Sequence, residues 1–276
     1  MTLEYEQVRT AVVTGGGHGI GRALCRRLAA DGLRVVVADI EAEAAQAVAS
    51  DVQGTAITVD VGDERQLSAM IDEVESSIGA IDLFISNAGV GFGDGADGAA
   101  SRGGAIGSVD DRWEDCWRVN VMAHVYAARA LVPRMRSRGG GLFVSVASAA
   151  GLLSQVGDAA YSATKHAAVA FAESLAITHA GDGIGVSVVC PQAVATRMIG
   201  IADDSDSIDG GFGGNDVDGV LRPEQVANIV VDGIRAGRFL ILPHPQVAAY
   251  FLRKASDYDR WIAGMRRFRN RLGAGD

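Results

Sequence analysis

The sequence alternates short runs rich in valine and isoleucine with longer segments of helical periodicity, and this alternation limits the folds that the chain can adopt. In the longer segments, apolar residues recur at three- and four-residue steps, as in residues 19–31, 63–78 and 222–235. Such alternation is typical of right-handed βαβ crossovers. We therefore expect one doubly wound α/β domain over residues 1–276, with a parallel sheet and helices on both faces. The seven expected strands are residues 10–14, 34–39, 55–61, 82–86, 141–147, 185–190 and 238–243.

The composition excludes several classes of protein. The chain has 276 residues and 48% hydrophobic content, enough for a large core, while its net charge of -9 argues against nucleic acid as a partner. Because no apolar stretch reaches about 18 residues and the first residues lack a signal-peptide pattern, we expect a cytoplasmic protein. The cysteines, Cys25, Cys116 and Cys190, are far apart, and the five histidines show no ligand spacing. We expect free thiols and no structural metal.

A glycine-rich segment separates the first expected strand from the first expected helix. Gly15, Gly19 and Gly21 would let backbone N–H groups and the positive helix end approach a pyrophosphate, although a glycine cluster alone also fits an ordinary turn. The second strand ends at Asp39, whose carboxylate would bind the adenosine ribose hydroxyls and repel a 2'-phosphate. The alternative role for Asp39 is to cap a helix that starts near residue 41. The pattern favours NAD as the cofactor.

A second motif places Tyr161 and Lys165 four residues apart in an alanine-rich segment without Pro or Gly. Residues at this spacing share a helix face, so the phenol and the ammonium group would point the same way. Alone, such a pair is more often found on a solvated surface than in a proton-handling site. The other motifs of the chain decide between these two interpretations.

With the glycines in the spacing TGxxxGxG, the chain resembles the short-chain dehydrogenase/reductase family over nearly its whole length. The remaining family motifs occur in the expected order, with Ser148 thirteen residues before Tyr161. One departure is Gln192, which stands where the family usually has glycine. The motif residues are Asp60 and Val61, the Asn87-Ala88-Gly89 triplet, Asn120, Ser148, Tyr161, Lys165, Pro191, Val194 and Thr196.

The resemblance implies a Rossmann-type fold that binds NAD along the carboxyl edge of the sheet. Asp60 and Val61 would flank the adenine, Thr196 would hold the carboxamide, and Lys165 would hold the nicotinamide ribose. Seen alone, Asp60 would also fit a helix cap and Asn87 an ordinary turn. The expected cofactor-binding residues are Thr14, Gly15, His18, Gly19, Ile20, Gly21, Asp39, Ile40, Asp60, Val61, Asn87, Ala88, Gly89, Tyr161, Lys165, Pro191, Val194 and Thr196.

The expected catalytic residues are Asn120, Ser148, Tyr161 and Lys165. Tyr161 is the candidate base; a free phenol titrates near ~10, and the neighbouring Lys165 would favour the phenolate. Ser148 would hydrogen-bond the substrate oxygen, or else only cap a turn. The resemblance implies that Asn120 anchors a water in a proton relay, and the alternative is a core-facing amide bonded to backbone.

We therefore expect an enzyme that interconverts a secondary alcohol and a ketone with NAD, acting on a small molecule. A catalytically silent NAD-binding regulatory protein remains an alternative, although it would need no proton relay. An epimerase or dehydratase on a related fold is another, but such enzymes usually carry a larger C-terminal substrate domain. The sequence pattern does not identify the substrate.

Two polar loops and the C-terminal tail depart from the strand–helix alternation. Residues 89–108 and 198–219 are rich in Gly, Asp and Ser, and we expect the second to be a mobile substrate lid. Residues 244–276 are expected to form a helical extension with an apolar stripe of Trp261, Met265, Phe268 and Leu272 beside five arginines. Membrane binding is the less favoured role for this tail. We expect it to cover the substrate cleft or to buttress an interface of a homodimer or homotetramer.

Overall fold

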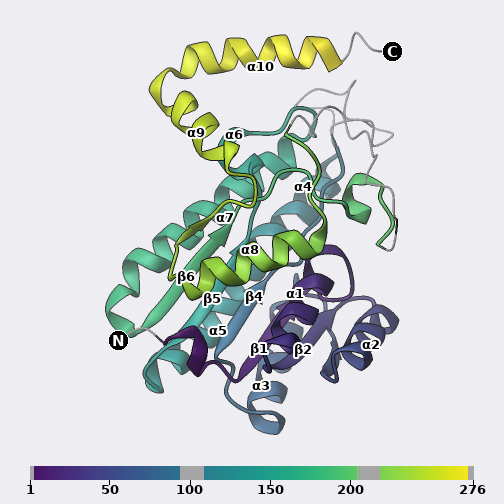
Figure 1. Ribbon diagram of the computed structural model, residues 1–276, viewed down its shortest axis with the longest axis vertical. Helices are drawn as coiled ribbons and strands as arrows, with labels where there is room; N and C mark the ends of the chain where they lie inside the picture. The colour runs from purple at the N-terminus through teal and green to yellow at the C-terminus, as the bar shows by residue number, and fades with distance from the viewer. Residues whose placement is uncertain (1–2, 94–108, 204, 206–217, 273–276) are drawn as a thin grey trace.

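The protein forms a parallel sheet of seven strands in the order β3-β2-β1-β4-β5-β6-β7 (Figure 1). The computed structural model describes residues 3–93, 109–203, 205 and 218–272. All strand pairs are parallel, and the order reverses direction between β1 and β4, which creates a crevice at the carboxyl edge. The strands are β1 Thr10–Thr14, β2 Arg34–Asp39, β3 Thr55–Thr58, β4 Leu83–Ser86, β5 Gly141–Val146, β6 Ile184–Val189 and β7 Leu240–Ile241.

Helices cover both faces of the sheet, as the alternation predicted. One face packs against α1 (Gly19–Ala30), α2 (Ala42–Asp51) and α8 (Pro223–Arg235). The other face packs against α3 (Glu64–Ser77), α5 (Ala123–Ser137) and the C-terminal half of α7 (Ala159–Thr178). The central strands β1, β4 and β5 are therefore buried on both sides, which explains their continuous apolar sequence.

Local sequence signals account for where several helices begin. Asp63 caps α3 by accepting hydrogen bonds from the backbone nitrogens of Arg65 and Gln66. Pro223 is the first residue of α8, where its missing N–H costs nothing. Asp158 caps α7 by accepting from the backbone nitrogen of Tyr161, and this cap fixes the start of the helix that carries the Tyr161–Lys165 pair.

The helical stretch that contains Asn120 is interrupted. Residues Asp110–Trp117 form α4, Arg118–Met122 form a π-helical turn, and α5 follows. π turns are rare and often lie at functional sites. Two expected strands are also shorter than expected: the strand predicted for residues 55–61 ends at Thr58, and the strand predicted for 238–243 is reduced to Leu240–Ile241.

After β7 the chain continues into two helices, α9 (Gln246–Ser256) and α10 (Tyr258–Leu272), which form the expected C-terminal extension. Figure 1 shows α10 in yellow, crossing above the ends of α6 (Ala150–Leu153) and α7. Among the described residues, no helix is both long and apolar enough to cross a membrane. Of the lid expected at 198–219, residues 204 and 206–217 lie outside the described part of the chain, as do residues 94–108 of the first polar loop.

Candidate active site

The turn between β1 and α1 has room only for glycine at the expected positions. Gly15 and Gly19 have φ angles of 62° and 48°, a region that side chains rarely adopt. A Cβ atom on Gly21 would collide with the carbonyl oxygen of Gly15, and one on Gly19 would lie 2.8 Å from Thr196 Cγ2. The bare backbone at the N-terminus of α1 therefore forms a cradle that suits the pyrophosphate of a dinucleotide.

An anionic side chain of the chain itself lies at this cradle. The Asp203 carboxylate accepts hydrogen bonds from the backbone nitrogen of Gly19 at 2.9 Å and contacts His18 Nδ1 at 2.8 Å. Arg197 Nε lies 3.0 Å from the same carboxylate, whose side chain is only 7% exposed. A carboxylate in this position shows that the helix end binds anions. Sequence reasoning placed Asp203 in the expected lid and gave no signal of this contact.

Asp39 lies at the carboxyl end of β2 and joins it to the glycine turn. Its Oδ2 accepts from the backbone nitrogen of Gly17 at 2.8 Å, and its Oδ1 accepts from that of Glu41 at 3.0 Å. Glu41, not Asp39, is the residue that precedes α2. The adjacent Ile40 side chain is 65% exposed and brings no positive charge to this end of the cleft.

Asn87 and Thr14 hold the carboxyl ends of β4 and β1 together. The Thr14 hydroxyl accepts from the backbone nitrogens of Asn87 and Ala88 at 2.9 and 3.2 Å. The Asn87 side chain in turn donates to the carbonyl oxygens of Thr14 and Gly15. Thr14 therefore supports the floor of the cleft from behind.

These residues surround a cleft of about 460 Å³ along the sheet edge. The lining includes every expected cofactor-binding residue except Thr14, Pro191 and Val194. Val194 lines a neighbouring cavity instead. Asp60 contributes its Oδ2 to an ion pair with Arg118 at 2.7 Å, and its Oδ1 accepts from the backbone nitrogen of Gly62. The described residues thus fit a dinucleotide cofactor in size and in hydrogen-bonding groups.

Both polar atoms of the Asn120 side chain are hydrogen-bonded to protein groups. Its Oδ1 accepts from the backbone nitrogen of Val90 at 2.9 Å, and its Nδ2 donates to Val90 O and to the Thr164 hydroxyl. This matches the core-facing amide that sequence analysis left open. These contacts hold the segment after β4 against α7. Gly89 in this segment packs closely on the site, because a Cβ atom added to it would lie 3.1 Å from Lys165 Nζ and 3.2 Å from Asn120 Oδ1. The relay water implied by the resemblance stays a prediction.

Tyr161 and Lys165 are both buried, so the pair does not lie on a solvated surface. The Lys165 ammonium donates to the carbonyl oxygen of Val146 at 3.1 Å and lies 5.5 Å from the centre of the Tyr161 ring. Burial lowers the pKa of Lys165 to about 8 and raises the pKa of Tyr161 to about 12, and the neighbouring Ser148 hydroxyl partly offsets the rise for Tyr161. We expected Lys165 to lower the pKa of Tyr161. The net rise reflects desolvation of the phenolate, and the role of Lys165 in favouring the phenolate stays a prediction.

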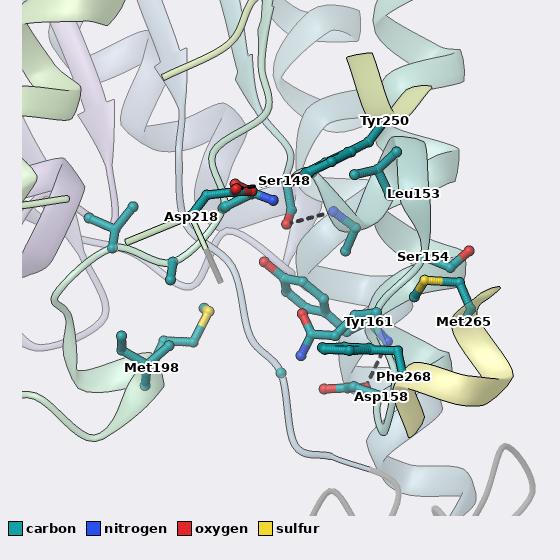
Figure 2. Close-up of a pocket in the computed structure, with 18 of the residues that line it drawn as sticks. Ser148, Leu153, Ser154, Asp158, Tyr161, Met198, Asp218, Tyr250, Met265 and Phe268 are labelled. Carbon is teal, nitrogen blue, oxygen red and sulfur yellow. Dashed lines mark hydrogen bonds between the residues drawn. The ribbon is translucent and has the colours of Figure 1, made fainter. Parts of the chain in front are cut away.

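Ser148 follows β5 and points into a cavity beside Tyr161 (Figure 2). Its Oγ accepts from the backbone nitrogen of Ala150 at 3.0 Å and lies 3.5 Å from Pro191 O, so it also caps the turn, as the alternative interpretation held. Gln192, the departure from the family pattern, causes no backbone strain, because its φ is not positive. Its backbone nitrogen donates to His244 Nδ1 at 3.1 Å.

The cavity beside Ser148 and Tyr161 has a volume of about 370 Å³ and is walled largely by apolar side chains. Three of the four stripe residues of the tail line it: Trp261, Met265 and Phe268. The side chain of Leu272, the fourth, lies outside the described part. Met198 and Asp218, from the segment expected to be the substrate lid, and Tyr250, from the tail, also line the cavity. Sequence reasoning did not single out Leu153 and Ser154, which line it as well. Ser154 has a positive φ of 67°, a strained backbone conformation of the kind that clusters at functional sites, and it is visible only in the structure.

The cysteines are buried free thiols, and within the described residues no three His, Cys, Asp or Glu side chains cluster closely enough to hold a metal ion. The site thus consists of a dinucleotide cleft, an adjoining apolar cavity, and a serine–tyrosine pair where the two meet.

Comparison with known proteins agrees with this geometry. Residues 9–206 match the short chain dehydrogenase family, and the chain belongs to it. It is therefore an oxidoreductase that acts on CH–OH groups and binds a nicotinamide cofactor.

Two curated relatives and one solved structure illustrate the likeness. The chain is 36% identical over 243 residues to 1-deoxy-11-beta-hydroxypentalenate dehydrogenase of Streptomyces exfoliatus, covering 85% of this chain and 82% of the relative. It is 33% identical over 193 residues to meso-2,3-butanediol dehydrogenase of Serratia marcescens, covering 69% and 73%. A short chain dehydrogenase/reductase from Burkholderia phymatum, solved in complex with NAD, has a TM-score of 0.79 and 27% identity, with coverage of 91% and 94%.

Proposed function

We propose that the protein interconverts a secondary alcohol and a ketone with NAD, and that Tyr161 moves the proton. The observation that carries this proposal is the position of Tyr161, which lines both the dinucleotide cleft and the apolar cavity. A proton carrier must reach the substrate oxygen while the reacting carbon faces the cofactor. Among the described residues, Tyr161, Thr196 and Met198 line both the cleft and the apolar cavity. Tyr161 therefore lies at the boundary between the two.

A bound nicotinamide supplies the hydride acceptor for oxidation or the hydride donor for reduction. The residues of the chain supply the rest. The Ser148 hydroxyl donates a hydrogen bond to the substrate oxygen, where negative charge develops. In oxidation Tyr161 acts as the phenolate and takes the hydroxyl proton, and in reduction it acts as the phenol and gives its proton to the carbonyl oxygen. A phenol with a pKa near 12 is protonated at neutral pH, which suits the donor role in reduction.

Lys165 has two roles in this proposal. Its ammonium group lies close enough to the Tyr161 ring to stabilise negative charge on the phenolate, and it lines the dinucleotide cleft, where it would hold ribose hydroxyls. Asn120 positions the segment that closes this side of the cleft. The water that would connect Lys165 to solvent is part of the proposal.

The preference for NAD over NADP rests on charge. Asp39 and Glu41 lie together at the end of β2, and Ile40 between them offers no cation. A 2'-phosphate would meet the Asp39 carboxylate as a like charge, whereas Glu41 already contacts His18 and Arg197. The solved relative from Burkholderia phymatum binds NAD, in line with this preference.

The proposal is tested by incubating purified protein with NAD and a panel of secondary alcohols while the absorbance of the reduced cofactor is followed. Steady accumulation of reduced cofactor supports an oxidoreductase. NAD binding without turnover on any alcohol or ketone would favour the silent regulatory alternative. Product formation without net cofactor reduction would favour an epimerase or dehydratase. Light scattering of the same sample tests the expected homodimer or homotetramer.

A further inference from the structure

We propose that α10 is the specificity-determining wall of the site and that it selects a bulky, uncharged alicyclic alcohol. The inference rests on the proposed function, because it assigns the cavity beside Tyr161 to substrate. It goes beyond that function by naming the class of substrate and the residues that choose it: Trp261, Met265 and Phe268.

The base of the tail is fixed to the body by buried contacts. Val247 of α9 is fully buried in the apolar cluster formed by α6, α7 and β6. Lys254 is 6% exposed, and its ammonium donates to the carbonyl oxygen of Leu152 at 2.7 Å and lies 3.3 Å from His166 Nε2. A buried ammonium is costly unless it is hydrogen-bonded, so these contacts hold α9 in one place.

The turn after α9 then directs α10 across the cavity. Asp257 accepts from the backbone nitrogen of Arg260 through its side chain and from that of Trp261 through its carbonyl oxygen. Because α10 begins there, Trp261, Met265 and Phe268, which are four and three residues apart, face the cavity. Arg260, Arg266 and Arg267 are exposed to solvent. Trp261 also packs against the apolar cluster beneath the tail. Figure 2 shows Met265 and Phe268 approaching Ser154 and Tyr161 from the side of α10.

The cavity has apolar groups on each of its three sides. The body contributes Ala149, Ala150 and Leu153, the segment after β6 contributes Val194, Met198 and Ile199, and the tail contributes Trp261, Met265 and Phe268. A volume of about 370 Å³ exceeds what a four-carbon alcohol fills. Small alcohols would leave most of the three walls without contacts, and apolar contact is the main source of affinity here.

Among the described residues, the charged groups of the lining do not form an anion site. Asp158 is occupied by the backbone nitrogens of Tyr161, Phe92 and Gly93. Asp218 accepts from the Tyr250 hydroxyl at 2.9 Å, and Arg253 lies over the Tyr250 ring at 5.7 Å. Two carboxylates and one arginine engaged with an aromatic ring would repel an anionic substrate more than attract it. We therefore assign an uncharged substrate.

A fused ring system fits this arrangement better than a linear chain of equal size. Rings present apolar surface to three walls at once and have few torsions to immobilise. A linear alcohol would lose more conformational entropy on binding, because each of its freely rotating bonds must be fixed. Decalin-2-ol and decan-2-ol have the same ten carbons and differ in this respect, so they form a matched pair of probes.

The experiment compares kcat and KM of the full-length protein with NAD for decalin-2-ol, decan-2-ol and butan-2-ol. We expect kcat/KM for decalin-2-ol to exceed the other two by about 10-fold or more. In Trp261→Ala and in Phe268→Ala, KM for decalin-2-ol should rise by about 10-fold, with a smaller change in kcat. Ile262→Ala is the control, since Ile262 lies on the same helix, is half exposed and does not line the cavity. Two separate tail variants guard against a folding defect in one, and thermal melting of each checks it.

Binding of decalin-2-one, followed by calorimetry, separates this inference from the proposed function. Turnover of all three alcohols with equal kcat/KM, unaffected by Trp261→Ala and Phe268→Ala, would overturn the assignment of α10 while leaving the function intact. Binding of decalin-2-one that is lost in both tail variants, with no turnover of any alcohol, would support the assignment and contradict the function. Absence of both binding and turnover would contradict both.

Discussion

The Asp203 carboxylate accepts a hydrogen bond from the backbone nitrogen of Gly19, 2.9 Å away, at the N-terminus of α1. The two residues are separated by 184 positions in the chain. The position is the one that the glycine turn offers to a pyrophosphate. His18 and Arg197 hold the side chain there, and we expect it to compete with the cofactor for this N–H group.

Asp203→Ala should strengthen NAD binding, because the docked carboxylate must leave before a pyrophosphate reaches Gly19. Removing a competing arrangement raises the fraction of binding-competent protein, and the apparent Kd falls by the same factor. Calorimetric titration with NAD should show a Kd several-fold lower than that of the unmodified protein. Asp232→Ala, an exposed change on α8, serves as the control. Weaker NAD binding by Asp203→Ala would mean that the carboxylate supports the cofactor site.

The fold and most of the cofactor cleft could be predicted from sequence because their signals are local. Buried parallel strands have continuous apolar sequences, the glycine turn directly follows β1, and Asp39 is the last residue of β2. The Asp203–Gly19 contact could not be predicted, since no spacing rule connects residues so distant. The π turn at Arg118–Met122 lies where Asn120 contacts Val90 and Thr164, two other segments of the chain. The burial that raises the pKa of Tyr161 could not be predicted either, because it is a property of the folded chain.

Tyr161→Phe should abolish turnover and leave NAD binding nearly unchanged, since it removes the proton carrier and little volume. General acid–base catalysis contributes about 100-fold or more, so kcat should fall by at least that factor. Lys165→Ala should impair both turnover and NAD binding, because the ammonium group lines the cleft as well as facing Tyr161. Initial rates and NAD titrations of both variants check this. A Tyr161→Phe protein that kept more than about a tenth of the rate would rule out the assigned role.

Cofactor preference should shift when the charge at the end of β2 is changed. Asp39 accepts a hydrogen bond from Gly17, so Asp39→Asn, which keeps one acceptor oxygen, is a milder change than Asp39→Ala. Combined with Ile40→Arg, it should lower the KM for NADP and raise that for NAD. Ile40→Arg alone, with Asp39 intact, should produce a smaller shift. Tighter binding of NADP than NAD by the unmodified protein would contradict the basis of this prediction.

Acid should destabilise the protein through His124. The side chain is fully buried, and neither ring nitrogen has a hydrogen-bond partner among the described residues. Burial, with a smaller contribution from Lys165, lowers the pKa of His124 from 6.5 to about 3. The unfolded chain therefore binds one more proton between these values, and stability falls as the pH drops from 6.5 towards 3.

At about 1.4 kcal/mol per pKa unit, the loss of stability reaches up to about 5 kcal/mol. His124→Leu should flatten the pH dependence of the free energy of unfolding over this range, as measured by urea denaturation. His179→Gln, near the surface, is the control. An equally steep pH dependence in His124→Leu would exclude His124 as the source.

The most direct test of the account is to follow the hydride itself. Purified protein is incubated with NAD and a secondary alcohol deuterated at the carbinol carbon, chosen from the panel by turnover or, failing that, decalin-2-ol. Mass spectrometry then measures the deuterium content of the reduced cofactor, with Tyr161→Phe as the parallel sample. Hydride transfer predicts reduced cofactor carrying one deuterium in the unmodified protein and almost none formed by Tyr161→Phe. Calorimetric binding of NAD without any labelled reduced cofactor would contradict the account.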